Sequence, residues 1–121
     1  MSRHDARDVV AHLAHDPQSR QAYLPIWFPE DTGKTTVRVP CTLGYHFIQR
    51  HKFLHCTYYI RSCDAVRHMR DDIYLTVRLQ LWMLEQLRLI DPDWKLVKPG
   101  LFTMHIVSLH MFRNDFIKRW P

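Results

Sequence analysis

The sequence has no apolar run long enough to cross a membrane, because its hydrophobic stretches are interrupted by Arg, His or Asp well before ~18 residues. It also lacks the cysteine pattern of a disulfide framework. Its cysteines, Cys41, Cys56 and Cys63, are an odd number, and no signal-peptide pattern is present. We therefore expect reduced thiols in a soluble protein that works in the cytoplasm.

Metal and phosphate-loop motifs are absent from the sequence as well. The histidines are scattered, and neither Cys-x-x-Cys nor His-Glu-x-x-His occurs, so the sequence predicts no metal site. The segment Gly33-Lys34-Thr35 lacks the earlier glycine and the preceding strand of a phosphate-binding loop, and we interpret it as a turn. A formal net charge of +5 favours anionic partners, but no groove-reading motif points to nucleic acid.

No repeat, low-complexity segment or linker divides the chain, so its 121 residues are expected to form one domain, residues 1–121. Apolar residues at helical spacing predict a short helix over residues 5–14 and a long helix over residues 72–89. A further helix is expected to begin at Arg113. The central part of the long helix, around Met83, should face the core.

Residues that favour β-structure predict strands over residues 22–28, 41–48, 53–60 and 101–112. The second and third of these strands should form an antiparallel hairpin, because residues 49–52 have the length of a hairpin loop. Pro25 indicates an edge strand or a bulge. Pro99-Gly100 predicts a turn before the last strand.

Three short segments carry side chains suited to chemistry: Pro40-Cys41, Arg61-Ser62-Cys63-Asp64 and Asp71-Asp72. A thiolate attacks electrophilic carbons, and an arginine beside a hydroxyl suits a phosphate. Each residue type also has an ordinary structural explanation. A free cysteine is more often a small buried hydrophobe, and acidic residues in a first helical turn interact favourably with the helix dipole.

The order of these segments resembles the thymidylate synthase family. Residues 16–20 come first, followed by Pro40-Cys41, a hairpin that ends in Arg61-Ser62-Cys63-Asp64, a long helix, and a strand that ends at His110. The resemblance covers nearly the whole chain but only the middle part of the family's fold. It implies an α+β core fragment of the thymidylate synthase fold, with a mostly antiparallel or mixed sheet packed against one long helix.

By this resemblance, Cys41 matches the thiol that adds to C6 of a pyrimidine ring. That addition makes C5 a carbon nucleophile able to attack the methylene of 5,10-methylenetetrahydrofolate, the implied cofactor. Asp64 matches a residue near the folate ring, although capping or pairing with a local arginine explains it equally well. We interpret Cys56 and Cys63 as structural.

The resemblance also assigns phosphate binding to Arg61 and Ser62. It implies a homodimer in which Arg20 is contributed across the interface into the other subunit's site. The family's second arginine at that place corresponds to Gln21, so we expect a weaker phosphate clamp.

His110 matches a family residue that holds the sugar 3′-hydroxyl, although a histidine on an apolar strand is more often a core residue. The tyrosine that the family places two residues later corresponds to Phe112. Because phenylalanine cannot donate a hydrogen bond, sugar recognition should be looser or should differ between ribose and deoxyribose.

Asp72 bears on the choice of base. Thymidylate synthases carry an asparagine at this position, and an amide offers both a donor and an acceptor to uracil. An ionised carboxylate only accepts, which favours the exocyclic amine of cytosine, with a shared proton at the ring N3. An Asp here resembles the cytidylate hydroxymethylases, and residues 67–74 replace the Gly-x-Pro-Phe-Asn-Ile pattern of ordinary thymidylate synthases.

The leading hypothesis is therefore folate-dependent C5 hydroxymethylation of a cytidylate, dCMP or CMP. One alternative is a thymidylate synthase or deoxyuridylate hydroxymethylase that acts on dUMP. Another is a non-catalytic remnant that binds nucleotide. The segments that carry the family's activating glutamate and its C-terminal closure are not found in this sequence, so we expect a partial family member.

Overall fold

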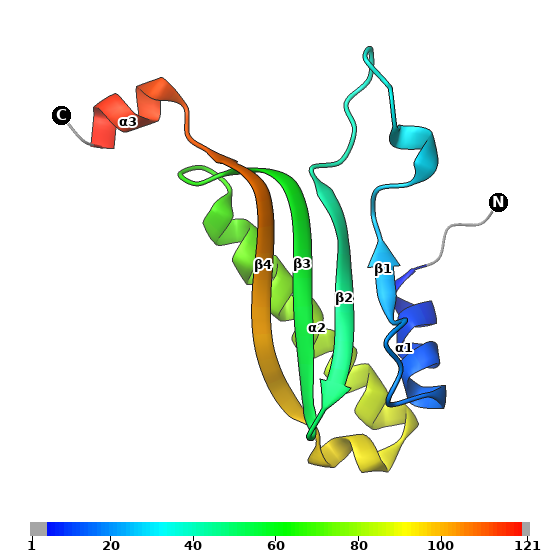
Figure 1. Cartoon of the computed structure of the whole chain (residues 1–121). Coiled ribbons are helices and arrows are strands. Elements are labelled where there is room, and N and C mark those ends of the chain that lie inside the picture. Colours follow the sequence, from blue (N-terminus) through cyan, green and yellow to red (C-terminus); the bar gives the residue numbers. More distant parts are fainter. Residues whose placement is uncertain (1–4, 120–121) are drawn as a thin grey trace.

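The computed structural model describes residues 5–119, which form one four-stranded sheet with two helices on one of its faces (Figure 1). The strands lie in the order β1 (Tyr23–Pro25), β2 (Thr42–Arg50), β3 (Phe53–Asp64) and β4 (Lys98–His110). β1 pairs antiparallel with β2, and β2 pairs antiparallel with β3, whereas β4 runs parallel to β3. The connection from β3 to β4 is the long helix α2 (Met69–Ile90). The α+β fold class, with a mixed sheet against one long helix, is confirmed.

The main hydrophobic core lies between the sheet and the two helices, α1 (Ala6–His15) and α2. Side chains of β3 alternate between its faces, so that Leu54 and Cys56 point into this core together with Phe47 of β2. The helices complete it, and their fully buried members include Leu13, Met83, Leu84 and Leu87. Burying each such side chain contributes roughly 1.5–3 kcal/mol.

The hairpin between β2 and β3 is tighter than predicted. Only His51 and Lys52 form the loop, and both have positive φ angles, 53° and 64°. A two-residue loop with this backbone matches the twist of the strands that it joins. At the loop, β2 therefore extends two residues further than predicted, to Arg50, while β3 begins at Phe53 as predicted.

The turn predicted at Pro99-Gly100 is wrong, because both residues lie in β4. Proline is tolerated near the start of a strand at the edge of a sheet, where its missing N–H is not needed. Gly100 allows a close approach of the His55 ring, since a Cβ there would lie 2.5 Å from Nδ1. The same ring nitrogen accepts a hydrogen bond from the backbone N–H of Leu101 at 2.9 Å.

The first strand is also shorter than the predicted 22–28. It ends at Pro25, after which the N–H groups of Ile26 and Trp27 both donate to the carbonyl of Leu43. Its place at the edge of the sheet is as predicted from its proline. A short 3₁₀ helix, Pro29–Asp31, follows it.

The predicted helices all appear, with shifted bounds. Asp5 caps α1, and α2 begins at Met69 rather than at residue 72. A 3₁₀ helix, Pro92–Leu96, leads into β4, and α3 (Arg113–Arg119) follows that strand. Among residues 5–119 no helix is both long and apolar enough to cross a membrane.

Candidate functional site

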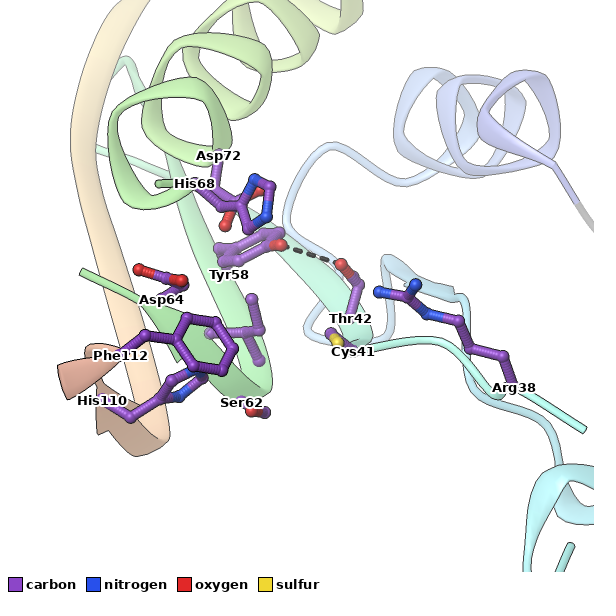
Figure 2. A pocket seen from close by; sticks show the side chains of 11 residues that line it. Arg38, Cys41, Thr42, Tyr58, Ser62, Asp64, His68, Asp72, His110 and Phe112 are labelled. Carbon is purple, nitrogen blue, oxygen red and sulfur yellow. Dashed lines mark hydrogen bonds between the residues drawn. The ribbon is translucent and has the colours of Figure 1, made fainter. Parts of the chain in front are cut away.

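A pocket of ≈ 360 Å³ lies at the end of the sheet opposite the hairpin, where β2 begins, β3 and β4 end, and α2 starts (Figures 1 and 2). Most of the predicted site residues line it: Cys41, Ser62, Asp64, Asp72 and His110. The remaining lining residues include a second group that the sequence did not single out: Arg38, Thr42, Tyr58, Ile60 and His68. Residues up to 74 positions apart, Arg38 and Phe112, thus meet at one cavity.

A β-bulge at the start of β2 brings Cys41 and Thr42 to this cavity. Thr42 pairs with Ile60, whereas Gly44 pairs with Tyr59, so Leu43 is an extra residue in β2. Without it, Thr42 would share the outer face of the sheet with the other even-numbered residues of β2, such as His46. The bulge turns Thr42 inward, where its hydroxyl hydrogen-bonds the Tyr58 hydroxyl at 2.7 Å.

Cys41 itself is half-buried, with its side chain against the pocket and the small apolar cluster below it. Its backbone carbonyl accepts a hydrogen bond from Arg61 N–H at 2.9 Å, which continues the pairing of β2 and β3. The thiol is thus fixed by the sheet and open to a ligand. A buried cysteine in a sealed apolar environment could not act as a nucleophile.

Asp72, in the first turn of α2, points into the pocket from the helix (Figure 2). Partial burial raises its pKa, while nearby His68 and the Cys63 thiol oppose this shift. Cys63 Sγ donates to Asp72 Oδ2 at 3.8 Å. A raised pKa increases the population of the neutral acid at a given pH, so this carboxyl group is suited to share a proton with a ligand.

Asp64, at the end of β3, has one satisfied and one unsatisfied oxygen. Oδ1 accepts hydrogen bonds from the backbone N–H groups of Val66 and Arg67, both at 2.9 Å, which caps the turn before α2. Oδ2 is buried and has no hydrogen-bond partner among the described residues. The Arg67 N–H is the main reason that the pKa of Asp64 is lowered, so the group is ionised. A buried carboxylate oxygen without a partner is costly, and a ligand N–H or O–H would satisfy it.

His110 and Phe112 form a wall of the pocket beside Asp64. Their rings lie 5.8 Å apart in an edge-to-face arrangement. The Arg67 guanidinium lies over the Phe112 ring, 4.6 Å from its centre, and Arg67 Nε also donates to Asp115 Oδ2 of α3 at 2.7 Å. These contacts attach α3 to the start of α2 and fix the wall.

Arg61 does not line this pocket. Its position in the alternation of β3 puts it on the outer face with Tyr59, where the guanidinium lies 5.9 Å from the centre of the Trp27 ring. Its Nε donates to Pro40 O at 2.9 Å and its Nη2 to Val39 O at 3.2 Å. In this conformation Arg61 supports the backbone before Cys41, and the structure does not bring it together with Ser62.

Arg20 lies away from the pocket, next to the outer face of the sheet. Its backbone carbonyl accepts a hydrogen bond from His46 Nε2 at 3.0 Å, and its side chain is exposed. Gln21, which follows it, is also exposed. Neither side chain lines the site of its own chain.

The other two cysteines are buried. Burial raises the pKa of Cys56 to about 12, so this thiol stays protonated in the core. Burial also raises the pKa of Cys63, and the adjacent carboxylate of Asp72 adds to the shift. Within residues 5–119, no group of His, Cys, Asp or Glu side chains is arranged to hold a metal ion.

One of the missed residues had a signal in the sequence. Tyr58 follows Leu54 and Cys56 in the alternation of β3. The sequence therefore predicts that the Tyr58 side chain, with its polar hydroxyl group, faces inward beyond the core. The inward turn of Thr42 depends on a bulge, for which the sequence gives no clear pattern.

The fold and the pocket together define a class: an α+β domain in which a thiol, two carboxylates and two histidines surround one cavity. The sequence profile of the family described as thymidylate synthase matches residues 3–118. The chain therefore belongs to the thymidylate synthase family, whose members are one-carbon transferases.

A solved structure supports the same fold. Thermostable thymidylate synthase A from Bacillus subtilis matches 95% of this chain with a TM-score of 0.77 and 19% sequence identity. This chain spans 38% of the length of that protein. A search of curated protein sequences found no match.

Proposed function

We propose that the chain is the nucleotide-binding core of a folate-dependent enzyme that hydroxymethylates C5 of a cytidylate, dCMP or CMP. The observation that carries this proposal is the position of Asp72. It is a carboxylate that faces the same cavity as the free thiol of Cys41. We place the reaction in the cytoplasm, where such thiols stay reduced.

Asp72 would read the base. A cytosine offers an exocyclic amine as a donor, which a carboxylate oxygen accepts, and its ring N3 is an acceptor that needs a proton. The raised pKa of Asp72 favours a proton shared between the carboxyl group and N3. Cys63 holds Oδ2 from one side, which orients the carboxyl group.

Cys41 would be the nucleophile. Its sulfur adds to C6 of the ring, and the electron pair of the C5–C6 double bond becomes available at C5 for attack on a one-carbon unit. To give a hydroxymethyl group, the C5 proton and the folate nitrogen would have to leave the adduct, and water would have to add to the exocyclic methylene that this produces on the pyrimidine. Departure of the Cys41 thiolate would then restore the C5–C6 double bond. The sheet pairing at Cys41 and the Thr42–Tyr58 hydrogen bond hold this part of the site in place.

The other residues would bind the sugar, the phosphate and the cofactor. Ser62 would donate to the phosphate and His110 to the sugar 3′-hydroxyl. Asp64 fits 5,10-methylenetetrahydrofolate, because its unpartnered buried Oδ2 can accept from a ring N–H. When bound, this cofactor supplies the one-carbon unit.

We further propose that the working unit is a homodimer formed through the outer face of the sheet. No helix of the described chain covers this face, and it exposes Phe53, Leu101 and Val107 (Figure 1). Arg20 lies beside this face and away from its own pocket, a position from which we propose that it contributes to the site of the second chain.

A second candidate is a non-catalytic chain that binds nucleotide. It would use the same pocket to hold the nucleotide without the covalent step at Cys41. A thymidylate synthase or deoxyuridylate hydroxymethylase remains the rival within the enzymes, and it requires Asp72 to be protonated, or bridged by water, when it meets uracil.

The substrate assignment is tested by replacing Asp72 with Asn and measuring the dissociation constants of dCMP and dUMP. We expect the wild-type protein to prefer dCMP and D72N to shift the preference toward dUMP by about tenfold or more, as for one good hydrogen-bonded contact to a base. D71N is the matched control, because Asp71 neighbours Asp72 on α2 but does not line the pocket. A wild-type preference for dUMP would reject the assignment.

A further inference from the structure

The pocket contains an imidazole that the reaction described above does not use. His68 immediately precedes the first residue of α2, and its exposed side chain lines the cavity. The side chain does not cap the helix, and among the described residues no hydrogen bond holds either ring nitrogen. Both nitrogens are therefore open to a ligand or to water, and an imidazole takes up and releases protons near neutral pH.

His68 faces the same part of the cavity as Asp72. The two residues are four positions apart, and the backbone N–H of Asp72 donates to the carbonyl of His68 at 2.9 Å, so their side chains lie on one face of the first helical turn. The ring is close enough to oppose the rise that burial causes in the pKa of Asp72. Figure 2 shows the two side chains next to each other, beside Tyr58.

The remaining titratable or charged groups of the cavity come from all of its walls: Arg38, Cys41, Tyr58, Asp64, Asp72 and His110. Burial raises the pKa of Tyr58, which stays protonated, and backbone hydrogen bonds lower the pKa of Asp64, which stays ionised. Arginine keeps its charge at any ordinary pH. His110 is the other imidazole, and it packs edge-to-face against Phe112 across the cavity from His68. His68 is thus the imidazole on the Asp72 side of the pocket.

A cytosine held by Asp72 would bring its C5 atom near His68. The exocyclic amine that Asp72 would accept from is on C4, and C5 is the ring atom between C4 and the C6 that Cys41 would attack. The hydrogen on C5 therefore lies next to the amine, where a side chain beside Asp72 can reach it. A general base must lie within hydrogen-bonding reach of the proton that it removes, directly or through one water.

We propose that His68 is the general base that removes the proton from C5 of the bound cytidylate. This inference rests on the proposed function and assigns the base for one of its steps. The neutral imidazole takes the proton as the C5–H bond breaks, and the electron pair of that bond stays with the pyrimidine. His68 then returns the proton to water.

The same step can be followed without the cofactor, in heavy water. After the Cys41 sulfur adds to C6, the electron pair at C5 takes up a deuteron from the solvent. His68 removes the original hydrogen as a proton, the C5–C6 double bond re-forms and the thiolate leaves C6. The net change is replacement of the hydrogen on C5 by deuterium, which proton NMR detects as loss of the H5 signal of dCMP.

The test compares this exchange in the wild-type protein, H68Q and C41A. We expect C41A to abolish the exchange and H68Q to slow it about 100-fold or more, the range for a lost general base. The dissociation constant of dCMP should change by less than about threefold in H68Q, because glutamine leaves Asp72 in place. H15Q is the matched control, because His15 is an exposed histidine at the end of α1 that does not line the pocket.

A second variant separates catalysis from positioning. In H68A, added imidazole should restore part of the exchange, because a soluble base can enter the space that the side chain leaves. The assignment of His68 is overturned if H68Q exchanges at the wild-type rate, if exchange falls only in proportion to dCMP affinity, or if imidazole does not restore it in H68A. If the wild type fails to bind dCMP, or exchanges no faster than C41A, the proposed function fails and the inference falls with it.

Discussion

The two ends of β3 have the same alternation of side chains but different roles in the structure. At the hairpin end, Leu54 and Cys56 point inward and are closed off by α1 and α2. At the other end, Tyr58 and Ile60 point inward in the same way, but Ser62 and the other polar residues beyond them face a cavity. One strand thus serves as core along half of its length and as the wall of a site along the other half.

The difference lies in what covers the strand. The helix α2 packs closely over the hairpin end with Met83, Leu84 and Leu87, whereas its first turn presents Asp72 to the pocket end. At the pocket end, the bulge in β2 turns Thr42 inward, whereas regular pairing would have placed this residue on the outer face. Polar side chains gather where close apolar packing ends, and there they can serve a ligand.

The largest effect should come from truncating the core end. Phe47 is fully buried in the core, and F47A should lower the free energy of unfolding by about 3–5 kcal/mol. Phe53 is 43% exposed at the hairpin, and F53A should change it by less than about 1 kcal/mol. Urea unfolding followed by circular dichroism measures both. Equal losses of unfolding free energy in F47A and F53A would contradict the burial of Phe47 and the exposure of Phe53.

A smaller effect is expected at a buried polar contact between the sheet and α2. Gln80 Nε2 donates to Leu54 O at 2.8 Å, where the pairing of β3 and β4 changes register. The variant Q80M keeps the length of the side chain but leaves this carbonyl unpaired, so it should cost about 1–3 kcal/mol. Q86M, on the same helix and only half-buried, is the control. A loss no larger than that of the control would contradict a role for the contact.

The smallest effects should be those of pH at the pocket end, and the two carboxylates should act in opposite directions. Burial raises the pKa of Asp72, so its contribution to stability is present below the ordinary value of 3.8 and is lost as the pH rises through the raised value. The pKa of Asp64 is lowered, chiefly by the Arg67 N–H. Its contribution to stability is therefore present above the ordinary value of 3.8 and is lost as the pH falls through the lowered pKa.

The measurement is urea unfolding of D72N and D64N between about pH 3 and about pH 6. D72N should become more stable relative to the wild type as the pH rises over this range, and D64N should become less stable. The same sign for both variants would show that the two environments do not differ as the structure indicates.

Much of the fold could be predicted from the sequence, because its signals are local. The apolar spacing of residues 72–89 and the β-formers on either side of His51 specify the helix and the hairpin without knowledge of distant contacts. The failures were also local. Pro99 and Gly100 are turn residues by composition, but an edge strand accepts the proline and a packed His55 ring requires the glycine.

The site could be predicted only as far as a family likeness allowed. Cys41, Asp64, Asp72 and His110 all line the cavity. The alternation of β3 puts Arg61 on the outer face, so its separation from the pocket follows from the strand pattern. The presence of Arg38 in the cavity and the inward turn of Thr42 could not be derived from spacing, because Arg38 lies before β2 and the bulge reverses the alternation at Thr42.

The most direct test of the account is mass spectrometry of the protein after incubation with 5-fluoro-dCMP or 5-fluoro-dUMP and 5,10-methylenetetrahydrofolate. The fluorine blocks loss of the C5 substituent and traps the covalent stage of the proposed reaction. We predict an adduct on the peptide that contains Cys41, retained in C56A and absent in C41A. An adduct on Cys56 or Cys63, or one that persists in C41A, would contradict the claim that the pocket end of the sheet is built around the Cys41 thiol.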